Sequence, residues 1–178
     1  MLITGFLFSP AVHDPLQNIL TASDVFLRKN DVLNALKIID DYVSKVASIP
    51  QNNKLKIKSQ LYKILSRSKT KSARSNCHVT LSKLFEKLSN ISGAIKELET
   101  AGKIDPQNGY IPLQLGRIHE DRLADHEKAM SYLKKTMDIY RSKRTPENKR
   151  NAEEAAKRYA KILELLNDKL RDLNSAKK

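Results

Sequence analysis

The chain has 178 residues and a formal net charge of +13 at pH 7, and its single cysteine excludes an internal disulfide framework. The length suits one domain, or a few helical repeats with an added terminal helix. Only five Gly and six Pro occur, and Val, Ile and Thr hardly alternate with polar residues, which favours an all-α fold. The chain has no Trp, so Leu, Ile and Ala must form most of the core.

Residues 1–15 form an apolar N-terminal segment that has neither a Lys nor an Arg. The segment is too short for a typical signal peptide, and no apolar run reaches the roughly 18 residues of a membrane-spanning helix. We therefore expect a cytoplasmic protein and no membrane-spanning segment. The N-terminal segment is expected to pack on the first helices, and the alternative is an anchoring or partner-binding role.

The positive charge is concentrated in one stretch, because no Asp or Glu occurs from Tyr42 to Phe85. Such a block favours encounters with acidic partners, nucleic acid or anionic lipid, and says nothing about fold. The stretch predicts a basic patch of eight residues, which are Lys54, Lys56, Lys58, Lys63, Arg67, Lys69, Lys71 and Arg74.

Leu81 to Pro106 is the most informative part of the chain. Leu81 and Phe85 lie four residues apart, as do Ala94 and Leu98, and each pair lines one face of a helix. A polar break separates the pairs, and Pro106 cannot continue a helix. The stretch therefore predicts two antiparallel helices that approach each other closely at Ala94.

This pattern resembles the tetratricopeptide repeat, a helix–turn–helix unit of 34 residues that stacks on copies of itself. With Pro106 as its closing proline, the unit covers residues 75–108. The same spacing fits residues 16–49 more loosely, with Asp31 as a helix cap, and residues 109–141 with a turn one residue longer. Residues 50–74 are interpreted as a degenerate unit, with one helix from about Asn53 to Ser66. The cationic stretch from Ser66 to Ser75 is either an exposed, mobile loop or the start of the next helix.

The last helix is expected within residues 146–178, starting at Thr145-Pro146. Its apolar residues alternate at intervals of four and three, as in the a/d seam of a coiled coil, at Ala152, Ala156, Tyr159, Leu163, Leu166, Leu170 and Leu173. We expect this helix to cap the last repeat, since the ends of repeat arrays must be covered. The alternative is a homodimer formed through the seam.

The resemblance implies an antiparallel helix-pair solenoid, a right-handed superhelix whose concave groove is lined by the first helix of each pair. Family positions carried onto this sequence predict a partner-binding groove at Asn76, Val79, Lys83, Lys87, Tyr110, Leu113 and Arg117, with Glu86, Glu120 and Asp121 beside them. Val79 and Lys83 stand where the first unit of a chaperone-tail-binding clamp has Lys and Asn, so that ligand is not implied. The cations predict a groove that is net positive.

Signatures of catalysis are not found in the sequence. Cys77-His78 has no second Cys to complete a metal site, and His119 and His126 straddle a predicted turn. We expect no enzyme activity, no metal and no cofactor. By resemblance, the expected function is a protein–protein scaffold that binds an acidic segment of another protein in its groove. The alternative is a basic helical nucleic-acid-binding protein, and contact with acidic lipid is the least favoured.

Overall fold

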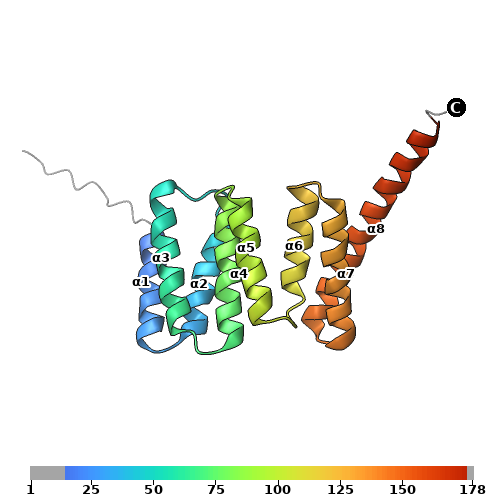
Figure 1. The fold of residues 1–178 in the computed structure, drawn as a ribbon. Coiled ribbons are helices and arrows are strands. Elements are labelled where there is room, and N and C mark those ends of the chain that lie inside the picture. The colour runs from blue at the N-terminus through green and yellow to red at the C-terminus, as the bar shows by residue number, and fades with distance from the viewer. Residues whose placement is uncertain (1–14, 176–178) are drawn as a thin grey trace, which may run out of the picture.

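The structure, a computed structural model, describes residues 15–175 without the side chain of Asn174, so the predicted role of the N-terminal segment lies outside the described residues apart from Pro15. All regular structure in this range is helical: α1 (Pro15–Arg28), α2 (Val32–Lys45), α3 (Gln51–Arg67), α4 (Lys71–Lys87), α5 (Ile91–Ile104), α6 (Tyr110–Asp121), α7 (His126–Ser142) and α8 (Pro146–Ser175). Successive helices run in opposite directions along a row, and α8 extends beyond the others (Figure 1). The all-α prediction is confirmed, and the packing is consistent with a helical repeat.

Three of the connections share one turn geometry. Asn30, Ser89 and Ala124 have positive φ angles of 60°, 56° and 50°. The residue after each of them is an N-cap whose side chain accepts a hydrogen bond from the backbone N–H three residues later; these caps are Asp31, Asn90 and Asp125. Helices α1–α2, α4–α5 and α6–α7 are therefore three hairpins of one kind, and the predicted cap at Asp31 is confirmed.

The two helices of these hairpins meet at small residues. Ala35, Ala94 and Ala129 occupy the same position after the three caps, and each is fully buried. The Ser23 hydroxyl donates to the Ala35 carbonyl at 3.3 Å, and a Cβ on Gly116 would lie 3.3 Å from the carbonyl oxygen of Ala129. Larger side chains at these crossings would push the backbones apart.

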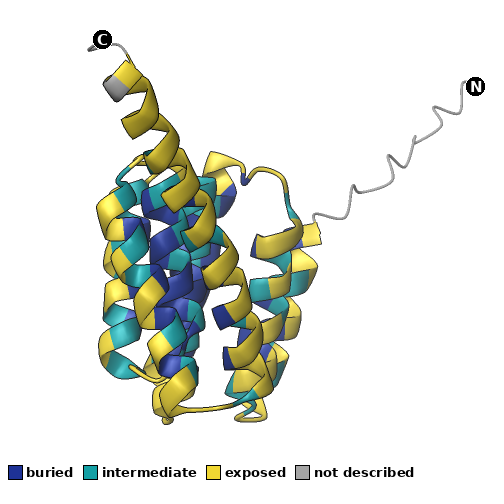
Figure 2. Ribbon diagram, turned by 90° about the vertical axis from the view of Figure 1, so that its right-hand side faces the viewer, coloured by how far each residue is buried: buried dark blue, intermediate teal, exposed yellow. Residues whose placement is uncertain are grey.

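The buried side chains form three clusters along the row. In the ribbon of Figure 2 the buried residues are drawn as dark blue segments of the helices. The first joins α1 to α4, the second joins α4 to α6, and the third joins α6 to α8. Helix α4 belongs to two clusters, with Leu81 and Leu84 in the first and Val79 and Phe85 in the second. It is consequently buried on two sides.

Residues 50–74 contain a single helix, α3, and the first turn of α4, joined by a link of three residues, 68–70. The Thr70 side chain caps α4 by accepting the Ala73 N–H at 3.1 Å, so Lys71 and Arg74 lie in a helix and not in a mobile loop. The sequence left this open because polar residues occupy the buried face. Ser75 is fully buried, and its hydroxyl donates to the Ala101 carbonyl at 3.1 Å.

Helix α8 begins at Pro146 as predicted, but its packed face is rotated from the predicted seam. Ala152, Ala155 and Ile162 are the buried apolar residues of this helix. Ala156 is exposed and Leu163 is 41% exposed, so these two members of the seam do not contact the last hairpin as expected. Tyr159 and Leu166, which the predicted seam also contains, lie against the third cluster. The helix leaves the body after Leu166, and Leu170 and Leu173 are 57% and 59% exposed.

Replacing Ala94 with Leu should lower the free energy of unfolding by about 1–3 kcal/mol, because the larger side chain has no space between α4 and α5. Urea denaturation measures the loss. Lys96→Leu, at an exposed site of the same helix, is the control and should change the midpoint little. An equal midpoint for the two variants contradicts the close crossing.

Two truncations separate the packed part of α8 from its projecting part. A chain that ends at Arg144 loses Ala155 and Ile162 from the third cluster, exposes Leu113 and Leu133, and should melt lower by about 10 °C or more. A chain that ends at Asn167 keeps those contacts and should melt within about 2 °C of the full chain. A change of dimer to monomer in the second truncation, measured by light scattering, would instead identify the projecting part as an oligomer interface.

Candidate functional site

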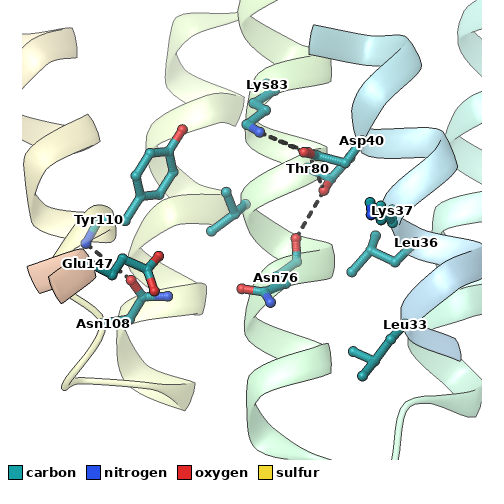
Figure 3. Close-up of a pocket in the computed structure, with 11 residues that line it drawn as sticks. Leu33, Leu36, Lys37, Asp40, Asn76, Thr80, Lys83, Asn108, Tyr110 and Glu147 are labelled. Carbon is teal, nitrogen blue, oxygen red and sulfur yellow. Dashed lines mark hydrogen bonds and ion pairs between the residues drawn. The ribbon is translucent and has the colours of Figure 1, made fainter. Parts of the chain in front are cut away.

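Two adjoining hollows lie between α2, α4 and α6, and together we call them the groove. The first has a volume of about 300 Å³, and its wall includes Leu36 and Asp40 of α2, Val79 of α4 and the ring of Tyr110 of α6 (Figure 3). The second has a volume of about 530 Å³. Lys83 and Tyr110 line both hollows, so they stand at the junction.

Lys83 connects two helices at this junction. Its ammonium group lies 2.9 Å from each carboxylate oxygen of Asp40, and the Thr80 hydroxyl donates to the same carboxylate at 2.8 Å (Figure 3). The Lys83 nitrogen is also 6.0 Å from the centre of the Tyr110 ring. The charge of Lys83 is therefore already paired with the Asp40 carboxylate of α2 when no ligand is bound.

The second hollow contains the other predicted groove cations. Arg117 donates to Glu86 at 2.6 Å and to Gln114 at 2.9 Å, which joins α6 to α4. Lys87 donates to the carbonyl of Val46 at 2.7 Å. Its wall carries four cationic side chains, those of Lys83, Lys87, Arg117 and Arg122, against the single carboxylate of Glu86. This hollow is thus net positive even though three of its cations are already bonded.

Tyr110 is the aromatic residue that lines both hollows of the groove. Burial raises the pKa of its phenol above the usual value, and nearby Lys83 only partly opposes that effect. The hydroxyl is therefore protonated at neutral pH, where it can donate a hydrogen bond to a ligand. Its ring presents an apolar face to the junction of the two hollows.

Six of the seven predicted groove residues line these hollows: Asn76 and Val79 the first, Lys87 and Arg117 the second, and Lys83 and Tyr110 both. The exception is Leu113, which is only 1% exposed and packs with Leu133 and Ile162 in the third cluster. Its side chain therefore packs against α7 and α8 and does not line the groove.

Sequence reasoning missed the contribution of α2, which includes Leu36, Lys37 and Asp40. The spacing of residues 16–49 made α2 the second helix of its pair, whereas the first helix of each pair was expected in the groove. The sequence signal that could have revealed the role of α2 was that residues 50–74 fit a single helix. Because helices alternate in direction, one unpaired helix makes α2, and not α1, parallel to α4 and α6.

The predicted basic patch extends along α3 and onto the start of α4. Its residues from Lys54 to Arg67 lie on α3, which at 1.5 Å per residue is about 25 Å long, and the other three follow at its far end. Lys63 pairs with Asp24 at 2.8 Å, Arg67 donates to the Leu27 carbonyl, and Lys58 lies over the rings of Tyr62 and Phe85. Among the described residues, Lys54, Lys56, Lys69, Lys71 and Arg74 form no ion pair.

The remaining reactive side chains lie within packing contacts. Cys77 is fully buried, and burial raises the pKa of its thiol to about 11, so it is protonated at neutral pH. His78 contacts Glu97 at 2.7 Å, and burial lowers the pKa of His119, which stacks on Tyr132. Within residues 15–175 no three His, Cys, Asp or Glu side chains are grouped to hold a metal ion, and none of the described helices has the length and apolar character needed to cross a membrane.

Comparison of the chain with protein-family models, with curated proteins and with solved structures finds no match. The assignment of a function therefore rests on the groove and on the charges of this chain.

The Lys83–Asp40 pair should hold α2 and α4 together. We expect a double-mutant cycle with Lys83→Met and Asp40→Asn to give a coupling free energy of about 0.5–1 kcal/mol, since both side chains are partly exposed. Unfolding in urea measures it at low salt, and the coupling should decrease at about 1 M salt because exposed pairs are screened. A coupling of zero at low salt contradicts a stabilising role for the pair.

Proposed function

We propose that this protein is a protein–protein interaction scaffold whose groove binds an extended acidic segment of a partner. The observation that carries the proposal is the continuity of the two hollows along α2, α4 and α6, which share Lys83 and Tyr110. Rigid helices supply the walls, so the groove is formed before a ligand arrives and little ordering free energy is lost on binding. The resemblance to tetratricopeptide units favours the same function.

The first hollow fits an apolar side chain. Leu33 and Leu36 from α2, Val79 from α4 and the Tyr110 ring contribute its apolar wall. Its charged residues are balanced, with Lys37 and Lys83 against Asp40 and Glu147. A Leu, Met or aromatic residue of the partner would bury apolar surface here, at about 25 cal/mol per Å² of area removed from water.

The second hollow favours a carboxylate. Arg122 is exposed and forms no ion pair within the described residues, so it can receive an acidic side chain without losing a partner. Lys87 and Arg117 stand beside it, and their bonds to Val46 and Glu86 hold them in place. An acidic residue that follows the apolar anchor along an extended segment therefore meets the positive end of the groove.

A display library of random extended peptides tests this specificity. We expect selection by the full chain to enrich peptides that combine a large apolar residue with Asp or Glu. For a selected peptide, Leu33→Asn and Arg122→Glu should each weaken binding about tenfold in fluorescence anisotropy, which corresponds to about 1.4 kcal/mol. Both side chains are exposed, so neither change disturbs the core.

Matched controls lie outside the groove. Leu55→Asn changes a residue on α3 that is 70% exposed, and Lys134→Glu changes an exposed cation on α7. These variants should keep the affinity of the original chain within about twofold, because surface changes away from a site act weakly. Enrichment of basic or purely polar peptides, or equal effects of groove and control changes, contradicts the proposal.

A further inference from the structure

The charge of this protein is separated between the two ends of its helices. Four connections, α1–α2, α3–α4, α5–α6 and α7–α8, lie one after another along the lower edge in Figure 1. We define the cationic end as these connections with four helical residues on either side, that is 25–35, 64–74, 101–113 and 139–149. It contains eleven Lys and Arg against three Asp and Glu, a net charge of +8.

The opposite end has no such excess. The connections α2–α3, α4–α5 and α6–α7, taken with the same margins, contain five Lys and Arg and five Asp and Glu. More than half of the chain's net charge of +13 is therefore gathered at one end. The separation results from the fold, because the charges come from four places that are far apart in the sequence.

Most of the cations of this end have no partner within the described residues. All eleven are exposed. Arg141 pairs with Asp138 at 2.9 Å, Lys149 lies 3.9 Å from Glu153, and Arg67 donates to a backbone carbonyl. The other eight form no ion pair within the part of the chain that the structure describes; they are Arg28, Lys29, Lys69, Lys71, Arg74, Lys103, Lys143 and Arg144.

Direct contacts place two of the connections together. Arg67 at the end of α3 donates to the Leu27 carbonyl at the end of α1, at 3.1 Å. Asn30 and Asp31 of the first turn line one hollow with Lys69 and Thr70 of the second. In the same way, Ser75 at the start of α4 bonds to Ala101 near the end of α5. The cations of the first three connections are thus neighbours on one surface.

We propose that the cationic end binds the phosphate backbone of a nucleic-acid duplex without reading its sequence. This site borders the first hollow, with which it shares Leu33 and Tyr110, but none of its cations lines the groove, and the proposal does not depend on the proposed function. Helices that pack side by side lie about 8–10 Å apart, so the three intervals between the four connections add up to about 30 Å. Over that length a duplex presents about 18 phosphates. The eight unpaired cations supply phosphate contacts of the kind that dominate sequence-independent binding.

The other side chains of this end favour a duplex over a single strand or a membrane. Its three aromatic residues, Phe26, Tyr110 and Tyr140, are all partly buried, whereas binders of single strands stack bases on aromatic rings. Its large exposed apolar residues are Val25 and Leu33, both at the α1–α2 connection. A surface that inserts into lipid needs apolar side chains along its whole contact.

The test measures binding of the full chain to labelled mixed-sequence duplexes of about 20 base pairs, DNA and RNA, by fluorescence anisotropy. The logarithm of the association constant should fall linearly with the logarithm of salt concentration, by about 0.9 per phosphate contact. Lys69→Glu, Lys71→Glu and Arg74→Glu in one variant should reduce that slope by about three and weaken binding at least about tenfold near 100 mM salt. Lys71→Glu and Arg74→Glu place acidic side chains in the first turn of α4, which suits the helix dipole, and Lys69 is exposed in the link before it, so this variant should fold, and its thermal midpoint checks that.

The matched control reverses three exposed cations outside this end, Lys45, Lys56 and Lys96, with the same change in net charge. It should weaken binding less than about threefold, since these three residues lie outside the surface that contacts the phosphates. Adding Lys143→Glu and Arg144→Glu to the first variant should weaken binding further. Equal losses in variant and control, no duplex binding by the original chain at low salt, or tighter binding to single strands or to vesicles of anionic lipid would each overturn the proposal.

Discussion

Helix α4 is packed in two of the three clusters, and the positions of the other helices depend on this. Leu81 and Leu84 join the cluster of α1–α3, and Val79 and Phe85 join the cluster of α5 and α6. A buried polar group without a partner costs about 1–3 kcal/mol, and two hydroxyls of this helix avoid that cost by bonding to its neighbours. Ser75 bonds to α5 and Thr80 to Asp40 of α2, at 3.1 and 2.8 Å, whereas the buried Ser82 hydroxyl has no partner. These bonds fix the spacing and register of α2, α4 and α5.

The position of the groove follows from the one described helix between hairpins that has no hairpin partner. Three hairpins repeat the same turn, in which a residue with positive φ precedes an Asp or Asn cap. Helix α3 stands between the first and second of them and shifts the alternation by one helix. As a result α2, the second helix of its hairpin, lines the groove beside α4 and α6, which are the first helices of theirs. Asp40 thereby meets Lys83, 43 residues away in sequence.

Local signals in the sequence predicted where helices begin better than they predicted which face of a helix packs against its neighbours. The cap at Asp31, the small residue at Ala94 and the helix start at Pro146 depend on residues within one or two turns, and all three agree with the structure. The packed face of α8 depends on where α6 and α7 lie, and a rotation of about 100° per residue moves contact from Ala156 to Ala155. Six of the predicted groove residues do line the hollows, because they lie on α4 and α6, which are the first helices of the second and third hairpins. Asp40 and the ion pairs could not be found, since no local pattern encodes contacts between distant helices.

The connection that follows α3 contributes to the difference in charge between the groove and the cationic end. In the groove, cations from α4 and α6 lie beside Asp40 and Glu86, so most of their charge is compensated within the protein. The stretch that contains α3 has no acidic residue, and its far end places Arg67 and Lys69 next to the turn that contains Lys29. Like charges within about one Debye length of roughly 8 Å repel one another, so this end destabilises the free chain slightly. A polyanion bound there removes that repulsion, whereas a ligand in the groove does not. The unpaired helix therefore brings α2 into the groove, and the connection that follows it supplies four of the eleven cations of the cationic end.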